Sequence, residues 1–332
     1  MTSLRIATRK SALALWQAER VRALLQARGH AAELVPLSTE GDRIVDRPLA
    51  EVGGKGLFVK ELEDALASGR ADLAVHSAKD VPFALPDGFV LSAFPLREDP
   101  RDALVAPLAR TFAGLPRGAR VGTSSLRRAV QLLAGRPDLV IVPVRGNVHT
   151  RLARATGDTV VRGGRAVRPA DGDPQGPLDA VVLALAGLRR LGLEGQATEI
   201  LPVELSLPAA GQGALAIETR AGSAAGEAAG ALDDAEIATL VRAERAVLER
   251  LAGGCTLPVA AYAEREGARI HLRALIGGAD PSGAIQLVRA EARGTVPRDL
   301  GLQVAELLLE RGGAPLLEAS RSRPGLPPPK RA

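Results

Sequence analysis

The sequence predicts an α/β protein followed by a smaller α+β part, and three observations lead to this expectation. From residue 4 to about residue 218, short apolar runs typical of buried strands alternate with amphipathic stretches, which is the pattern of an α/β fold. After Asp233 the pattern changes to a helix, three strands and a final helix, which predicts an antiparallel sheet. The 332 residues, 46% of them hydrophobic, are enough for two or three domains.

The first elements follow from strand runs and helix caps. A strand over residues 4–8 leads to Ser11, which can cap a helix that stops at Gly29. The residues expected on one face of that helix are Leu13, Trp16, Val21, Leu24 and Leu25. Further strands are predicted over 32–37 and 71–75, with a helix over 57–68 between them.

The pattern restarts near Asp102. The predicted elements are strands over 103–106 and 120–121, a helix from Ser124 to Leu133, a strand over 139–144, a helix from about Asn147, and strands over 179–185 and 213–218. Residues 156–177 are rich in Gly, Pro and Arg, which favours a hairpin or a loop insertion.

The last part opens with a helix that runs to about Leu251. The strands that follow are predicted over 258–264, 269–276 and 284–292, and the last helix over 297–311. The tail from Arg321 to Ala332 contains three consecutive prolines and is expected to be disordered.

Composition excludes several kinds of protein. One cysteine cannot form an internal disulfide, and with four scattered histidines it cannot build a zinc cluster of the usual spacing. Five Phe, one Trp and one Tyr are too few for stacking platforms that bind single-stranded nucleic acid, and the net charge of +5 is not concentrated in one block. Without a membrane-length apolar segment or a hydrophobic signal core, a soluble, cytoplasmic protein is expected.

Three strand-to-helix junctions offer helix N-termini beside hydroxyl and arginine side chains. They are Thr8 to Ser11, Gly122 to Arg128, and Val144 to Asn147. Ordinary helix capping explains any one of them. Three such junctions at the carboxyl ends of strands favour a site for a polyanionic ligand.

The glycine-rich segment Gly53-Gly54-Lys55-Gly56 is not a nucleotide phosphate loop, because a glycine follows the lysine where Ser or Thr is required. A mobile surface loop and an active-site lid both remain compatible with it.

The segment from His76 to Pro82 places Lys79 and Asp80 next to each other after a buried strand. A catalytic acid–base position and a plain loop salt bridge both fit this placement, whereas His76 is expected to be a hydrogen-bonded structural histidine.

Cys255 follows two glycines in a turn. It could be a buried core residue, or an exposed nucleophile or covalent attachment point.

Seven segments, in order along residues 4 to about 311, resemble the porphobilinogen deaminase (hydroxymethylbilane synthase) family. They are RKSALALWQA (9–18), GGKGLFVKELE (53–63), HSAKDVP (76–82), GTSSLRR (122–128), RGNV (145–148), LPAAGQGA (207–214) and AGGC (252–255). The resemblance implies a transferase that adds four porphobilinogen molecules head to tail to a dipyrromethane cofactor, with loss of ammonia, and then releases hydroxymethylbilane by hydrolysis. It also implies a monomer that acts in tetrapyrrole biosynthesis.

The resemblance further implies a role for individual residues. Asp80 is the expected catalytic residue, and Cys255 the expected thioether anchor of the cofactor. The other expected cofactor ligands are Ser77, Lys79, Thr123, Ser125, Arg127, Arg128, Arg145, Gly146 and Ala184. The expected substrate ligands are Arg9, Ser11, Lys55, Phe58, Arg145 and Arg151. Each pyrrole carries an acetate and a propionate, so arginines and helix N-termini suit these ligands chemically.

The implied fold has two α/β domains like those of type II periplasmic binding proteins, with the active site in the cleft between them, and a small C-terminal α+β domain with an antiparallel sheet. The expected boundaries are residues 1–100 with 208–232, then 101–207, then 233–318, and a disordered tail over 319–332. The crossovers near 96–101 and 207–213 are expected to act as hinges. Three features depart from the family pattern: His149, the long connection 155–177, and the proline-rich tail.

Two rival functions stay open at this point. A non-catalytic anion-binding protein of the same two-lobed fold would need neither a third domain nor an exposed cysteine. A nucleic-acid binder is favoured only by the high pI of about 9.9, without the clustered basic and aromatic residues that such binding requires.

Overall fold

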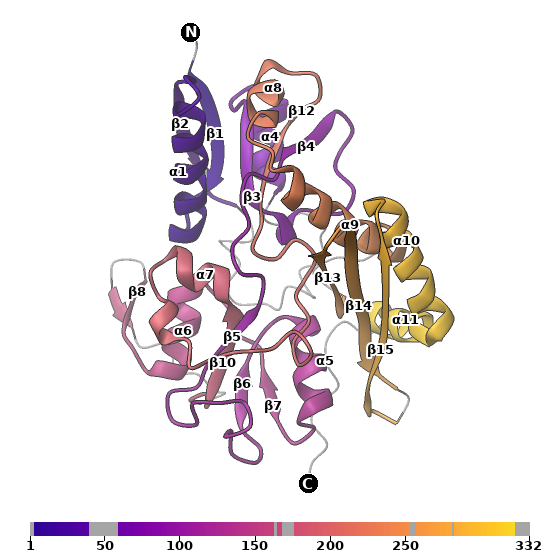
Figure 1. Ribbon diagram of the computed structural model, residues 1–332. Coiled ribbons are helices and arrows are strands. Elements are labelled where there is room, and N and C mark those ends of the chain that lie inside the picture. The colour runs from indigo at the N-terminus through magenta and orange to yellow at the C-terminus, as the bar shows by residue number, and fades with distance from the viewer. Residues whose placement is uncertain are drawn as a thin grey trace.

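The structure is a computed structural model that describes residues 3–39, 59–162, 165–167, 176–252, 257–280 and 282–322. Figure 1 shows two α/β units, one above the other, and a third unit beside them. Each unit is built around its own sheet, and a separate hairpin joins β8 (Val160–Arg162) to β9 (Arg165–Val167) within the region predicted to be a hairpin or a loop insertion.

The first sheet has the strand order β2-β1-β3-β12-β4. Its strands are β1 (Leu4–Arg9), β2 (Ala32–Leu37), β3 (Leu73–Ser77), β4 (Phe89–Ala93) and β12 (Leu215–Arg220). Its helices are α1 (Ala12–Gln26), α4 (Lys60–Ala67) and α8 (Ala224–Gly230). Neighbouring residues of one strand belong to different cores: Ile6 packs with Val21 and Leu25 of α1, whereas Ala7 packs with Leu62 of α4. The sheet is therefore apolar on both faces, as a mostly parallel sheet covered by helices requires.

The second sheet has the order β11-β5-β10-β6-β7. Its strands are β5 (Asp102–Val105), β6 (Arg120–Gly122), β7 (Val140–Val142), β10 (Ala180–Ala184) and β11 (Glu199–Ile200). Its helices are α5 (Leu126–Gly135), α6 (Val148–Thr156) and α7 (Leu185–Arg190).

Both sheets repeat one arrangement. In each, three parallel strands are followed by one strand that runs antiparallel to its neighbours, β12 in the first sheet and β5 in the second. Each antiparallel strand is the first one after the chain arrives from the other sheet, through crossover 94–101 or crossover 201–214. The crossovers run beside each other, because the Glu98 amide donates to the Gly213 carbonyl at 3.0 Å. This repeated topology confirms the two α/β units of the predicted fold class.

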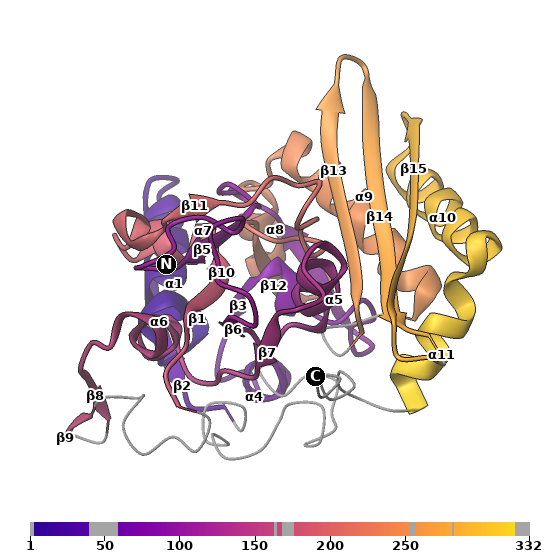
Figure 2. The ribbon, with the colours of Figure 1, turned by 90° about the horizontal axis from the view of Figure 1, so that it is seen from below.

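The third sheet is antiparallel, in the order β13 (Val259–Glu266), β14 (Arg269–Ala279) and β15 (Ile285–Gly294). Helices α9 (Ala235–Leu251), α10 (Pro297–Leu308) and α11 (Ala314–Ser322) pack against it (Figure 2). Within the described residues no helix is both long and apolar enough to cross a membrane.

The prediction for the first helix was right for Val21 and Leu25, which are buried, and wrong for Trp16, which is exposed. The buried residues of α1 are Ala14, Gln17, Ala18, Val21 and Leu25. Trp16 is 38% exposed, and the Arg190 guanidinium lies 5.6 Å from its ring centroid. Alanines allow α1 to approach the sheet closely, and an alanine-rich helix has apolar residues on more than one face, so its periodicity did not identify the buried one.

Other boundaries also differ from the prediction. Within the described residues α4 begins at Lys60, and the predicted start at residue 57 lies outside them; β3 covers 73–77 instead of 71–75. A further helix, α11, follows a kink at Gly312 and runs to Ser322, so residues 319–322 are helical and not disordered. Leu316 and Leu317 explain this extension, because both are buried in the core of the third sheet.

Candidate active site

The short turn Ala78–Asp80 follows β3 and carries the predicted catalytic carboxylate. Ala78 is buried, and Gly211 of crossover 201–214 lies against it. A Cβ at Gly211 would come within 3.0 Å of the Ala78 side chain, and its φ of +71° is a conformation that glycine adopts most easily. The turn that positions Asp80 is therefore packed directly against the crossover.

Side chains from two helices hold both ends of this turn. Gln17 of α1 donates to the Ser77 hydroxyl at 2.8 Å. Arg245 of α9 donates to the carbonyls of Val81 at 3.1 Å and Pro82 at 2.6 Å. Asp80 thus lies in a backbone segment held by α1 on one side and by α9, the helix before the third sheet, on the other.

Lys79 is the second polar residue of the turn, and its ammonium donates to Gln212 Oε1 at 3.2 Å. Removal of the ammonium from water lowers the pKa of Lys79 to about 8, and the Arg128 charge acts in the same direction, whereas Asp80 and Asp102 oppose it. A lysine with this pKa can gain or lose its proton near neutral pH.

The predicted caps are found at the helix N-termini. Ser11 accepts from the Ala14 amide at 3.3 Å at the start of α1. Ser125, not Ser124, caps α5 and accepts from the Arg128 amide at 3.4 Å. Asn147 accepts from the Thr150 amide at 3.0 Å at the start of α6. Helix capping thus explains these three side chains, while the positive ends of the helix dipoles remain suited to anions.

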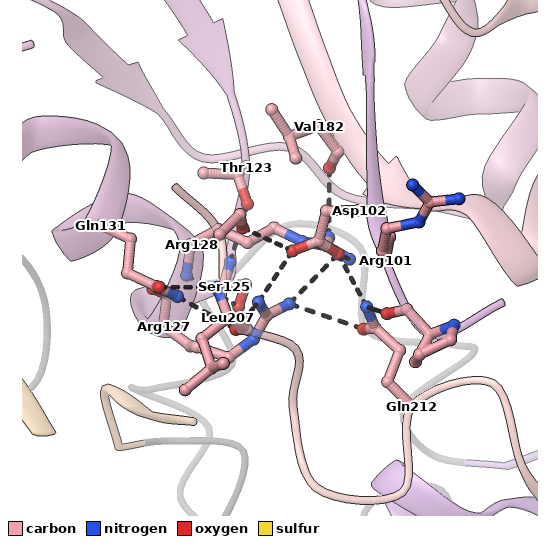
Figure 3. A network of polar contacts seen from close by, with 12 residues as sticks. Arg101, Asp102, Thr123, Ser125, Arg127, Arg128, Gln131, Val182, Leu207 and Gln212 are labelled. Atoms are coloured by element: carbon pink, nitrogen blue, oxygen red, sulfur yellow. Dashed lines mark hydrogen bonds and ion pairs between the residues drawn. The ribbon is translucent and has the colours of Figure 1, made fainter. Parts of the chain in front are cut away.

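A buried carboxylate, Asp102, collects four donor side chains around it, and Figure 3 labels three of their residues, Arg127, Arg128 and Gln212. Arg127 Nη1 donates at 2.7 Å, and Arg128 donates through Nη2 at 2.7 Å and Nε at 3.0 Å. Ser206 Oγ at 2.7 Å and Gln212 Nε2 at 2.8 Å complete the set. These five residues are called the Asp102 cluster below.

Burial by itself would raise the pKa of Asp102, but the Arg127 and Arg128 charges and their hydrogen bonds hold it well below its usual range. Burial also lowers the pKa of Arg127, against the pull of Asp102. Asp102 is therefore ionised at neutral pH and balances part of the positive charge that two buried arginines bring into the site.

Sequence reasoning missed Asp102, Gln17 and Gln212. It assigned Arg127 and Arg128 to ligand carboxylates, yet in the structure both are bound to a carboxylate of the protein itself. The sequence did contain a signal, because an acidic residue opens the apolar strand β5, and a buried charge requires a partner.

Further cations surround Asp80 on the side of the second sheet. Arg151 of α6 donates to the Gly146 carbonyl at 2.8 Å. Removal from water and the Arg128 charge lower the pKa of Arg151 to about 10, with smaller effects of Arg145 and Arg9, whereas Asp80 raises it. Arg128, Arg145 and Arg9 are thus close enough to Arg151 to repel its charge, and an anionic ligand would relieve that repulsion.

Gly146 makes the backbone path between Arg145 and Arg151 possible. Its φ is +94°, and a Cβ there would lie 2.9 Å from the Thr150 side chain. Glycine is the residue that accommodates both the conformation and the lack of space.

The remaining predicted residues have varied surroundings. Thr123 is buried and accepts from the Ser125 amide at 3.2 Å, and Ala184 lies at the N-cap of α7. His149 is exposed on the first turn of α6. His76 is buried and its Nε2 lies 2.9 Å from Glu218 Oε2. Lys55, Phe58 and Cys255, with the glycine-rich segment 53–56, lie outside the described residues.

Asp102→Asn is expected to destabilise the protein by about 3–5 kcal/mol, because it leaves two buried guanidiniums without their counter-ion. Urea unfolding at pH 7 measures this. The matched control is Glu306→Gln, which removes the ion-pair partner of Arg250. Both side chains are about half exposed (44% and 48%), so this variant should lower the free energy of unfolding only slightly. Equal losses from both variants would contradict the structural role of Asp102.

The fold and the site together define a class: a two-sheet α/β protein with a fixed carboxylate turn facing a group of cations that suits a polyanionic ligand. Among the described residues no group of three or more His, Cys, Asp or Glu could hold a metal ion.

Comparisons with known proteins agree with this class. Residues 4–228 match the family described as "Porphobilinogen deaminase, dipyromethane cofactor binding domain", and residues 238–310 match "Porphobilinogen deaminase, C-terminal domain". A porphobilinogen deaminase of Syntrophotalea carbinolica is 50% identical over 327 residues, which cover 96% of each chain. The chain belongs to the porphobilinogen deaminase family.

Solved structures with some similarity include a lipoprotein and a periplasmic substrate-binding protein. A YaeC-family lipoprotein of Enterococcus faecalis is 16% identical with a TM-score of 0.40, over 72% of this chain and 94% of its own. A periplasmic substrate-binding protein of an ABC transporter from Coxiella burnetii is 14% identical with a TM-score of 0.42, over 71% of this chain and 94% of its own.

Proposed function

We propose that this chain condenses four porphobilinogen molecules head to tail onto a covalently held dipyrromethane, with loss of ammonia, and then hydrolyses off hydroxymethylbilane. The structural observation that supports this most directly is the Asp80 turn beside the cations of the second sheet. A single carboxylate among several cations suits a reaction in which a polyanionic ligand reacts at a centre that becomes positive.

The residues present fit a dipyrromethane, which has two pyrrole rings and carries acetate and propionate groups. The repulsion of Arg151 by Arg128, Arg145 and Arg9 is what carboxylates would relieve. The segments that precede α5 and α6 lie side by side, because the Val144 amide donates to Ser124 Oγ at 3.0 Å, and both helix N-termini suit anions. When bound, the dipyrromethane supplies the nucleophilic pyrrole carbon at which chain growth begins. We propose Lys79, Ser77, Thr123, Ser125, Arg127, Arg128, Arg145, Gly146 and Ala184 as its ligands and Cys255 as its anchor.

Asp80 is the residue we propose to act in the chemistry. Loss of ammonia from porphobilinogen leaves a positive charge shared with the pyrrole nitrogen. A carboxylate at that nitrogen stabilises the charge by electrostatics and can accept or return the pyrrole proton. The Gln17 and Arg245 hydrogen bonds would keep the turn from moving as this charge appears and disappears.

For the incoming porphobilinogen we propose Arg9, Ser11, Lys55, Phe58, Arg145 and Arg151 as ligands. Arg9 follows from its place at the carboxyl end of β1, beside the α1 N-terminus and within the electrostatic reach of Arg151. Lys55 and Phe58 are proposed from the family resemblance alone. A monomeric state and a cytoplasmic location likewise remain predictions.

We also propose that the three sheets correspond to three domains: residues 1–100 with 208–232, residues 101–207, and residues 233–318. The largest hydrophobic cluster of each sheet is separate from the others and supports this division, while Ala238 and Val241 of α9 pack with Ala216 of β12 and so attach the third domain to the first. The adjacent crossovers 94–101 and 201–214 are then the only two covalent links between the first two domains within the described chain, and they would serve as the hinge.

The experiment that tests the function is incubation of the purified holoprotein with porphobilinogen. Equimolar release of ammonia and formation of hydroxymethylbilane, with four porphobilinogen molecules consumed per product, are expected. Binding of porphobilinogen without ammonia release would show a binding protein instead.

The pKa of Lys79, lowered to about 8, predicts a pH dependence of cofactor uptake. Below pH 8 the ammonium is charged and can pair with a carboxylate; above pH 8 it loses its proton, and uptake by the apoprotein should fall by up to about tenfold. Intact mass after timed exposure to porphobilinogen at pH 6.5–9.5 measures this. In Lys79→Arg the charge persists over this pH range. Cofactor uptake by the wild type, relative to uptake by the variant, should therefore fall as the pH rises. A ratio that stays constant would contradict the assignment of Lys79 as a cofactor ligand.

A further inference from the structure

Gln212 is fully buried in crossover 201–214, between the first two sheets. Its Nε2 donates to the Pro100 carbonyl at 2.6 Å and to Asp102 Oδ1 at 2.8 Å. Its Oε1 accepts from Lys79 Nζ at 3.2 Å, and Arg127 Nη2 lies at 3.5 Å (Figure 3 shows the Asp102 and Arg127 contacts). The Gln212 amide thus connects the turn after β3, crossover 94–101 and the other residues of the Asp102 cluster.

The orientation of this amide is fixed by its surroundings. Two acceptors, a carbonyl and a carboxylate, face the nitrogen, and two cations face the oxygen. If the amide were turned over, its NH2 group would face the two cations, and its oxygen would face the carbonyl and the carboxylate. All four contacts would then be repulsive. Because all four contacts are to buried or partly buried groups, the side chain has one arrangement.

The charged groups around Lys79 show why such a contact matters. Asp80 lies in its own turn, Asp102 on β5, and Arg127 and Arg128 on α5. The two arginines repel the ammonium while the two carboxylates attract it, and burial disfavours its charge. The oxygen of Gln212 provides a neutral acceptor between Lys79 and Arg127, and so allows two cations to lie near each other.

We propose that Gln212 is a positioning residue that holds the Lys79 ammonium in fixed register with the Asp102 cluster, so that the cofactor ligands of the first and second sheets act as one unit. This inference rests on the proposed function, because it assumes that Lys79 binds the cofactor. Gln212 itself has its amide committed to protein groups and acts through Lys79.

The same contacts give Gln212 a role between the two sheets. Its side chain holds Pro100 of crossover 94–101, while its backbone carbonyl accepts from Arg97 Nε at 3.1 Å. A change in the relative position of the crossovers would therefore be transmitted to Lys79 through a single side chain.

The test is a double-mutant cycle in the holoenzyme with Gln212→Met, Lys79→Met and both together. Methionine keeps the length of the side chain and removes its hydrogen bonds. Gln212→Met is expected to lower kcat by about tenfold, the effect of one hydrogen bond to a charged group, with little change in KM for porphobilinogen. In the Lys79→Met background the same substitution should lower kcat by less than about twofold, because the ammonium that Gln212 contacts is absent.

Gln131→Met is the matched control. Gln131 is also a buried glutamine that holds crossover 201–214, through the Leu207 amide at 2.7 Å and the Leu207 carbonyl at 3.1 Å. Neither contact involves Lys79. Its effect on kcat should be the same whether Lys79 is lysine or methionine.

A tenfold loss from Gln212→Met in both backgrounds would overturn the proposal, as would an unchanged kcat in the single variant. If Gln212→Met does not fold, Gln212→Asn replaces it in the cycle; it keeps an amide but withdraws it from Lys79 by one methylene, and it should show the same non-additivity. An inactive wild type would refute the proposed function instead, so the two failures are distinguishable.

Discussion

Asp80→Asn is expected to reduce turnover of porphobilinogen by about a thousandfold or more, while the protein stays folded and retains its cofactor. Asparagine has the same shape but cannot stabilise a positive charge or accept a proton, and each of these contributions is worth about 10²- to 10⁴-fold. Ammonia release in single-turnover and steady-state assays measures the loss, and intact mass confirms that the cofactor is present.

Two further variants sharpen this test. Asp87→Asn changes an exposed carboxylate a few residues along the same connection and should leave turnover unchanged. Asp80→Glu keeps the charge but moves it by one methylene, so it should retain more activity than Asp80→Asn. Ammonia release by Asp80→Asn within tenfold of wild type would remove Asp80 from the mechanism.

Cys255→Ser is expected to yield a protein without covalently bound pyrroles and without turnover. The purified wild type should exceed its chain mass of 34.4 kDa by the mass of a dipyrromethane, and the variant should not. Because the chain has one cysteine, a thiol reagent gives an independent answer: the denatured wild-type holoprotein should be unreactive, since its sulfur is held in a thioether.

Apoprotein is the control for the thiol measurement, because it should react with one equivalent of reagent and lose that reactivity on exposure to porphobilinogen. An active wild type with an unmodified mass and a free thiol would show that Cys255 is not the anchor.

The sequence predicted the elements whose signals are local. Ser11 and Asn147 were found as helix caps, because a cap bonds to an amide three residues away and the signal is contained in one turn. Strand β2 has the predicted bounds, residues 32–37. The buried face of α1 was predicted only in part, for Val21 and Leu25 but not for Ala14, Gln17 and Ala18, since an alanine-rich helix can turn more than one face toward a sheet and only packing decides between them.

The candidate site was predictable in part. The sequence placed Asp80, Lys79 and the arginines at strand ends and helix starts, and the structure places Arg9, Arg128 and Arg145 within electrostatic reach of Arg151. The sequence did not indicate that Arg127 and Arg128 share an internal carboxylate. That pairing joins residues 25 and 26 positions apart across two elements.

By itself, then, the sequence determined the class of fold, the family resemblance and the residues able to carry chemistry, because hydrophobic period, capping and motif spacing are local properties. The tertiary structure decided which charges neutralise one another. Gln212 and Asp102 are 110 positions apart, and Gln212 and Lys79 are 133 apart. A buried charge must find a partner, but which partner it finds depends on how two sheets are joined by their crossovers, and that is a property of the folded chain alone.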